Sequence, residues 1–193
     1  MITPLGQGRP RNGMWFQTML LYTLSGGISA YVIGWLLGAV GALTLCRFVS
    51  LGLLWGTFSV FCAVLAFRDA GIVSFPMPEV KRQAPQFWLI RFGYGSAVLM
   101  WGTYIGLGVA TFITLSGFYA LFLGALLSGR PGGGLIILGY WAGRVLPVWL
   151  APIALPPRYQ ISRTSLPLRV LRASSTFALA QCVVLGIINT VAW

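Results

Sequence analysis

The stretch MWFQTMLLYTLSGGISAYVIGWLLGAVGALTL, from Met14 to Leu45, contains no charged side chain. A transmembrane helix needs about 20 consecutive, mostly apolar residues. At a rise of about 1.5 Å per residue, one helix over this stretch would be about 48 Å long, whereas the hydrocarbon core of a bilayer is about 30 Å thick. We therefore predict a membrane-spanning helix that either tilts and extends into water or bends at the sequence SGGIS, Ser25–Ser29.

Four further apolar stretches predict membrane spans at residues 49–67, 92–128, 134–155 and about 173–191. The stretch 92–128 would be about 55 Å long as one helix, and its Gly and hydroxyl residues at 106–117 indicate a candidate break. A long stretch, a tight turn, a shorter stretch and a basic, Pro-rich connection occur twice, which is a weak internal repeat. The predicted fold is all-α: one polytopic transmembrane domain over 1–193, a bundle of about five helices, two of them long and bent or broken.

The composition restricts the chemistry of the chain. Hydrophobic residues make up 58% of the 193 positions and charged residues 8%, against about 45–50% and about 25% in an ordinary soluble domain. There is no His to ligate a metal or to act as a base near neutral pH. The only acids, Asp69 and Glu79, lie in the connection 68–91, which excludes paired carboxylates within an apolar stretch. We therefore predict a protein that is not an enzyme and holds no metal or cofactor.

Basic residues are distributed unevenly over the predicted connections. If each stretch crosses once, Arg47 and Arg130 fall on one side. Ten fall on the other: Arg9, Arg11, Arg68, Lys81, Arg82, Arg91, Arg158, Arg163, Arg169 and Arg172. The positive-inside rule then places the N-terminus in the cytoplasm and the C-terminus outside. We expect a multi-pass protein of a bacterial inner (plasma) membrane whose basic connections, 68–91 and 156–172, contact anionic lipids, and we expect no binding of nucleic acid.

Pairs of glycines four residues apart recur in the apolar stretches. They are Gly34/Gly38, Gly52/Gly56, Gly102/Gly106 and Gly139/Gly143. In lipid such pairs allow two helix backbones to approach closely. They predict tight helix packing, by default within the chain, with homodimer faces or sliding surfaces as the alternative.

Arg144 lies near the middle of the stretch 134–155, where a charge costs at least about 2.5–3.5 kcal/mol. No acid within the predicted spans can pair with it. We predict that Arg144, together with Tyr140, contacts a partner group: backbone carbonyls at a broken helix, an anionic ligand or lipid headgroup, or a carboxylate on another subunit. The alternative is that Pro147 and Pro152 distort the helix and let Arg144 reach the membrane surface.

Hydroxyl side chains recur along the stretch 92–128, among them Thr111 and Thr114. They could line a polar path and contact a ligand there. The alternative is that they bond to the backbone or across a helix pair, as hydroxyls in membrane helices commonly do.

The three cysteines are Cys46, at a predicted helix end, and Cys62 and Cys182, within helices. By helical rise, Cys62 and Cys182 differ in depth within the predicted bundle by about 7 Å. This difference disfavours a dithiol pair but does not exclude contact between the two residues. The favoured interpretation is that they are unreactive and serve as small apolar residues.

The stretch GLGVATFITLSGFYALFLGALLSGRPGGGLIILGYWAGRVLPVWLAP, residues 106–152, resembles a helix pair of the cytochrome c biogenesis and thiol–disulfide interchange (DsbD-type) transmembrane family. The positions that match are Gly139, Gly143, Leu146 and Pro147. The resemblance implies two helical half-repeats with broken helices around a central site, and transfer of reducing equivalents through two cysteines that each adjoin a proline. No Cys of this chain adjoins a Pro, so the resemblance bears on architecture rather than on redox activity.

Two classes of function fit these features. The first is a non-catalytic integral membrane subunit or scaffold of a larger respiratory, photosynthetic or biogenesis complex, which accounts for the lack of titrating groups, the close-packing glycines and the need of Arg144 for a partner. The second is a small permease or a thiol/redox carrier of the DsbD-like transporter group. Ion coupling ordinarily uses an acid within the membrane and dithiol transfer uses a Cys pair. We therefore favour the subunit.

Overall fold

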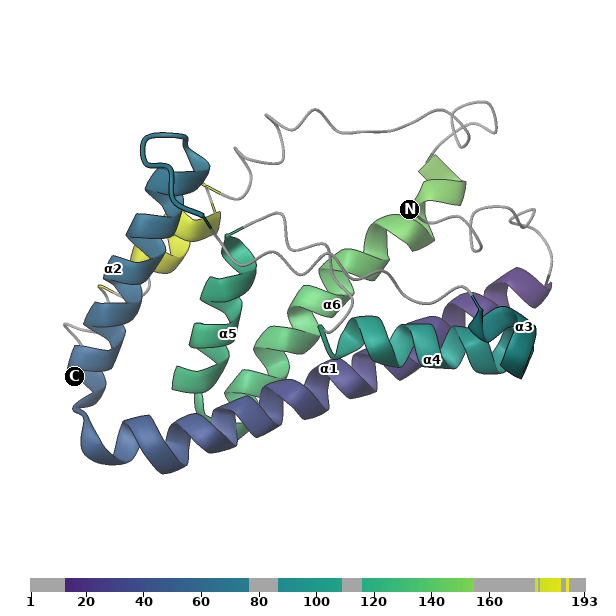
Figure 1. Cartoon of the computed structure of the whole chain (residues 1–193), viewed down its shortest axis with the longest axis horizontal. Helices are drawn as coiled ribbons and strands as arrows, with labels where there is room; N and C mark the ends of the chain where they lie inside the picture. Colours follow the sequence, from purple (N-terminus) through teal and green to yellow (C-terminus); the bar gives the residue numbers. More distant parts are fainter. Residues whose placement is uncertain are drawn as a thin grey trace. The chain divides into compact units, whose positions relative to one another are not determined.

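The computed structural model describes residues 13–76, 87–108, 116–154, 176, 178–184 and 187, and every regular element in these ranges is helical (Figure 1). The chain divides into two compact units. Unit 1 comprises Met1–Tyr31, Arg82–Thr111 and Leu138–Thr164, and unit 2 comprises Val32–Lys81, Phe112–Ile137 and Ser165–Trp193. The prediction of an all-α chain with membrane-type helices is confirmed.

Helix α1, Gly13–Phe48, is continuous through the SGGIS sequence, so the helix is not broken at 25–29. The serine hydroxyls in this sequence form hydrogen bonds with carbonyl oxygens of α1 itself. Ser29 Oγ donates to the carbonyl oxygens of Ser25 (2.9 Å) and Gly26 (3.0 Å), and Ser25 Oγ donates to that of Tyr22 (3.2 Å). Because α1 is 36 residues long, about 54 Å by helical rise, its excess length over a bilayer core is taken up by tilt or by protrusion.

Three helices are long and apolar enough to cross a membrane within the described ranges. Their apolar parts are Trp15–Leu45 of α1, Leu51–Asp69, which is the whole of α2, and Gly129–Leu150 of α6 (Gly129–Ala154). The sequence GRPGGG, residues 129–134, which joins the predicted spans 92–128 and 134–155, instead forms the start of α6. Pro131 is compatible with a first helical turn because it lacks an N–H that would need a partner there.

The stretch 92–128 is divided between several helices. Helix α3 covers Trp88–Phe92, α4 covers Tyr94–Gly106 and α5 covers Gly117–Leu127. The interruption lies at the predicted position, and Gly108, with φ 74°, adopts a conformation that favours glycine. At about 20 Å and 17 Å, neither α4 nor α5 crosses a bilayer core by itself. The prediction of about five spans is therefore not confirmed; of the last one, residues 178–184 are described and helical.

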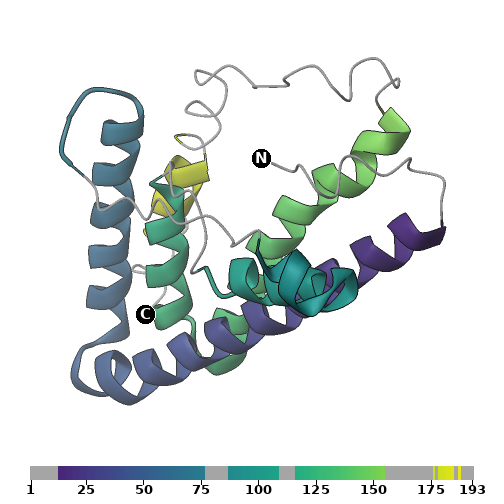
Figure 2. The same ribbon diagram turned by 45° about the vertical axis from the view of Figure 1, so that its right-hand side comes forward.

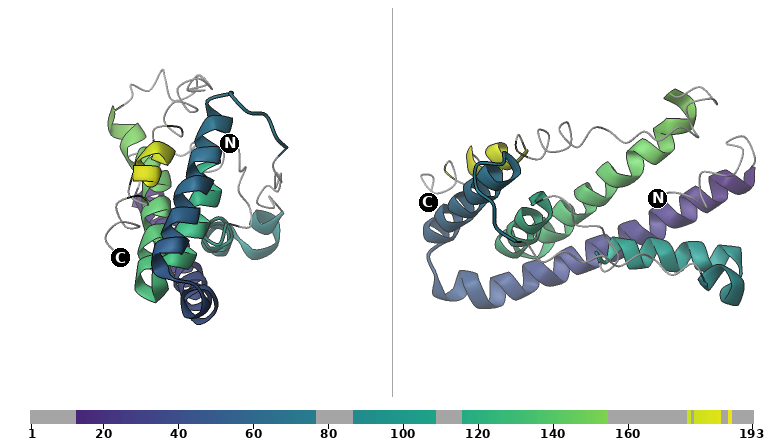
Figure 3. Two further views of the ribbon diagram at one scale, coloured as in Figure 1. Left: turned by 90° about the vertical axis from the view of Figure 1, so that its left-hand side faces the viewer. Right: turned by 45° about the horizontal axis from the view of Figure 1, so that its top comes forward.

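In unit 1, α4 runs along the N-terminal part of α1 (Figure 3). The contact is made by glycines. A Cβ added at Gly102 would collide with Ser25 Oγ, and one added at Gly106 would collide with the carbonyl oxygen of Gly26 and the hydroxyl of Ser29. The two helix backbones therefore meet at the close distance that the Gly102/Gly106 spacing allows.

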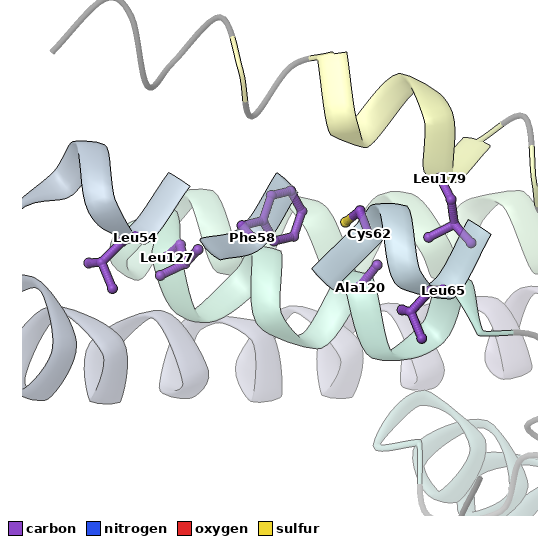
Figure 4. Packing of buried hydrophobic residues seen from close by; sticks show 7 residues of the cluster. All are labelled: Leu54, Phe58, Cys62, Leu65, Ala120, Leu127 and Leu179. Atoms are coloured by element: carbon purple, nitrogen blue, oxygen red, sulfur yellow. The ribbon is translucent and has the colours of Figure 1, made fainter. Parts of the chain in front are cut away.

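In unit 2, α2 and α5 lie side by side (Figures 1 and 2). Their shared core continues onto the segment 178–184 (Figure 4). It consists of Leu54, Phe58, Cys62, Leu65, Ala120, Leu127 and Leu179. The four α2 residues recur every three or four positions and so occupy one face of the helix. This face of α2 is the one that the unit buries.

Candidate functional site

Helix α6 has one buried face and one open face. Trp141 and Val145 are buried, whereas Leu135, Leu146 and Leu150 expose 62%, 57% and 48% of their surfaces. At about 100° per residue, the open face also contains Gly139 and Gly143. A Cβ added at either glycine would meet no atom of the described residues within 4 Å. We call the set Leu135, Gly139, Gly143, Leu146 and Leu150 the open face of α6.

Two indole groups determine which side of α6 is buried in unit 1. Trp141 Nε1 donates to the carbonyl oxygen of Thr23 (3.0 Å), and Trp149 Nε1 donates to the hydroxyl of the same residue (2.9 Å). Thr23 Oγ1 in turn donates to the carbonyl oxygen of Met19 (2.7 Å). A Cβ at Gly26 would collide with the Trp141 ring, so the indole lies directly on the α1 backbone.

Arg144 is exposed, and it lies about 100° around the helix from Gly143, the nearest residue of the open face. Its Nη1 donates to the hydroxyl of Tyr140 at 3.4 Å, and its guanidinium carbon lies 5.9 Å from the centre of the Tyr140 ring. Both contacts are to a neutral group one helical turn away. The two acids of the chain, Asp69 and Glu79, belong to unit 2. Arg144 and Tyr140 therefore contact each other, unit 1 holds no acid that could be a counter-ion of Arg144, and their predicted contact with a partner group stays a prediction.

The other predicted small-residue positions lie in two settings. Gly34 and Gly38 of α1 lie against the backbone of α6 in unit 2, where added Cβ atoms would collide with the carbonyl oxygens of Gly133 and Gly129. Gly52 and Gly56 of α2 are half-buried and line a shallow hollow on the helix surface together with Leu53, Thr57 and Val60.

The predicted hydroxyl path cannot be placed, because Thr111 and Thr114 lie outside the described residues. A different polar cluster lies where α2 ends and α5 begins. Ser116 Oγ donates to Asp69 Oδ1 (2.6 Å) and accepts from Arg68 Nη1 (2.8 Å). Arg68 and Asp69 also form an ion pair at 3.5 Å, and Arg68 Nε donates to the carbonyl oxygen of Phe75 (3.2 Å).

This polar cluster corrects the assignment of Asp69 to a polar connection. Arg68 and Asp69 form the last turn of α2, and the Asp69 side chain is only 5% exposed. Since Arg68 balances its charge and Ser116 fills part of its hydrogen-bonding capacity, the cluster joins two helices of unit 2. Nothing in this arrangement requires a substrate.

Cys62 and Cys182, whose contact the sequence leaves open, lie at the same core cluster. Cys62 is fully buried in the unit 2 core, and Cys182 packs against the same cluster and is half-buried. Periodicity could not reveal this contact, because it does not tell which face of the C-terminal segment meets α2. Cys46 lies within α1, and its side chain is outside the described part of the chain.

Comparison with known proteins gives one informative similarity. No family model matches the chain, and no solved structure matches it. The chain is 26% identical over 151 residues to the methylamine utilization protein MauF of Paracoccus versutus, covering 77% of this chain and 54% of MauF. It thus spans about half the length of that relative. The comparisons show a similarity to MauF and do not show membership of the thiol–disulfide interchange family.

Proposed function

We propose that the chain is a non-catalytic integral membrane subunit that binds a helix of a different protein along the open face of α6. The observation that supports this most directly is the position of Arg144. An exposed cationic side chain in the apolar part of α6 lies about 100° around the helix from Gly143, and no atom of the described residues lies within 4 Å of a Cβ added at Gly139 or Gly143. A partner helix placed between Gly143 and Arg144 would meet the glycine surface on one flank and the guanidinium on the other.

Charge determines the kind of partner. A guanidinium within lipid is stabilised best by a carboxylate or another anion that accepts two parallel hydrogen bonds. Tyr140 offers a neutral hydroxyl at 3.4 Å, which is a long hydrogen bond. A second copy of this chain would bring only Asp69, which already contacts Arg68 and Ser116, and Glu79, which the sequence places in a connection. The partner that fits is therefore a transmembrane helix of another protein that carries Asp or Glu.

The glycines determine how that helix would bind. Because lipid gives apolar side chains little reason to leave it, helix association in membranes depends on close backbone approach and polar contacts. Gly139 and Gly143 permit such an approach and Leu135 and Leu146 would flank it. The similarity to a protein named for methylamine utilization supports a biogenesis or utilization assembly over a photosynthetic one.

The location follows from the sequence and is part of the proposal. The chain would lie in a bacterial inner membrane with its N-terminus in the cytoplasm and its basic connections against anionic lipid. Reporter domains fused after residue 48 and after residue 76 test this orientation. A periplasmic signal from the first fusion and a cytoplasmic signal from the second support it, and the reverse pattern refutes it.

Purification in a mild detergent tests the proposed function. We expect an unrelated membrane protein to copurify in a fixed ratio, and we expect Arg144→Leu to reduce its recovery at least about tenfold, as loss of about 1.4 kcal/mol or more would do. Arg144→Lys should recover only part, since Lys cannot form the paired bonds of a guanidinium. Arg130→Leu is the matched control on the same helix, because Arg130 stacks on Trp35 in unit 2. A monodisperse chain without partner, or equal recovery with Arg144→Leu, refutes the proposal.

A thiol/redox carrier is the second candidate, and the contact between Cys62 and Cys182 favours it. A variant with all three cysteines replaced by Ala separates the two functions. The subunit proposal expects normal copurification and normal growth on whatever depends on the chain. A carrier would lose function in that variant while the protein remained abundant.

A further inference from the structure

The thiols of Cys62 and Cys182 meet within the apolar core of unit 2. Cys62 lies in the row of α2 side chains that faces α5 and the segment 178–184 (Figure 4). Leu179, three residues before Cys182, is part of that core, so both residues present the same side of the segment to α2. Cys182 packs against the cluster that contains Cys62. A disulfide needs two cysteines on segments that pack against each other, and the core of unit 2 provides this arrangement.

The two thiols differ in access. Cys62 is 0% exposed, whereas Cys182 is half-buried at the edge of the core. Their neighbours are aliphatic and aromatic side chains, among them Leu65, Ala120 and Leu179. A polar oxidant would have to leave water to reach them, whereas an apolar oxidant dissolved in the lipid is already in a medium of this kind. Such an oxidant would reach Cys182 first.

We propose that Cys62 and Cys182 form a reversible disulfide that fastens the segment 178–184 to α2, with a lipid-soluble quinone as the oxidant. Two S–H bonds break and one S–S bond forms. The two electrons and two protons released pass to the quinone, which becomes the quinol. A thiol reductant reverses the bond by exchange. This proposal does not depend on the open face of α6, and the bond serves to hold two parts of unit 2 together.

Thiol labelling tests the bond in the full chain in membrane vesicles. In a Cys46→Ala background, two thiols remain, and a maleimide carrying polyethylene glycol shifts the denatured chain twice on a gel. After treatment with a decyl-substituted benzoquinone we expect both shifts to disappear, and dithiothreitol to restore them. Cys62→Ala in the same background should keep the single shift of Cys182 after quinone treatment.

Each other result overturns the proposal. Two shifts that persist after quinone treatment mean that the thiols do not pair. Loss of the Cys182 shift in the Cys62→Ala variant, or loss that dithiothreitol does not reverse, means that the quinone alkylates a thiol instead of oxidising a pair. Copurification of the partner is measured on the same samples. If Cys62→Ala leaves copurification of the partner unchanged, the disulfide and the binding of a partner to α6 are independent properties, and a failure of one does not refute the other.

Discussion

Ser116 provides the sharpest test of the packing of unit 2. Its hydroxyl donates to Asp69 Oδ1 at 2.6 Å and accepts from Arg68 Nη1 at 2.8 Å. Ser116 is fully buried, and the side chains of Asp69 and Arg68 are 5% and 23% exposed. Replacing Ser116 by Ala removes both bonds and leaves two charged groups poorly solvated near the ends of two helices.

The size of the effect follows from these bonds. A hydrogen bond to a charged group contributes about 1.5–3 kcal/mol net. The two bonds of Ser116 are not additive, because Arg68 and Asp69 stay within 3.5 Å of one another after the hydroxyl is lost. We therefore expect Ser116→Ala to lower the free energy of unfolding by about 2–3 kcal/mol.

The assay is unfolding of the purified chain in mixed micelles by a denaturing detergent, followed by circular dichroism. Ser96→Ala is the matched control, because Ser96 is an exposed serine of α4, and it should change the free energy of unfolding by less than about 0.5 kcal/mol. If the two variants unfold alike, the cluster does not hold α2 and α5 together and the reasoning fails.

Three other substitutions test the helix contacts. Gly38→Ala should lower the free energy of unfolding by about 1–3 kcal/mol in the same assay, because its Cβ would meet the Gly129 carbonyl oxygen; an unchanged value would show that the contact is loose. Gly139→Ala should stabilise the isolated helix by up to about 1 kcal/mol, since no atom of the described residues lies within 4 Å of the added group. It should nevertheless reduce partner recovery, because the added Cβ holds the partner helix further away; unreduced recovery would remove the open face from the partner site. Thr23→Val should lower the free energy of unfolding by about 0.6 kcal/mol, the usual contribution of such a hydrogen bond in membranes. It should also change the fluorescence of Trp149, because that indole loses its hydroxyl acceptor; identical spectra would contradict the bond.

The sequence predicts correctly those features that the bilayer imposes on any chain that crosses it. Apolar length predicts helices because the lipid core offers backbone groups no partner but one another. The interruption after Gly106 is also readable, since Gly and hydroxyl residues gather there. The stretch 25–29 shows the limit of that reading. It also combines Gly with hydroxyl residues, yet α1 runs through it. Its serines bond to their own helix, and its glycines let other elements approach.

Contacts between distant segments could not be predicted. Thr23 meets Trp141 and Trp149 across 118 and 126 positions, and Asp69 meets Ser116 across 47. The helical period of a sequence shows which residues share a face of one helix, but it does not show which other helix packs against that face. Glycine pairs show this most plainly, because Gly34/Gly38 and Gly139/Gly143 have the same spacing. Added Cβ atoms at the first pair would collide with α6 backbone, and at the second pair they would meet nothing.

The charges of the chain indicate why it would need partners outside itself. The chain has thirteen basic residues and only two acidic ones, and of the acidic ones Asp69 already contacts Arg68 and Ser116. Basic residues in the connections can each gain about 1 kcal/mol from anionic lipid near the membrane surface. Arg144 is different, because it lies six residues before Leu150, where the apolar part of α6 ends, about 9 Å along the helix. If α6 stood upright with Leu150 at the lipid surface, the guanidinium would lie below the headgroups, and an acid on a neighbouring helix at the same depth would be the anion that pairs with it directly.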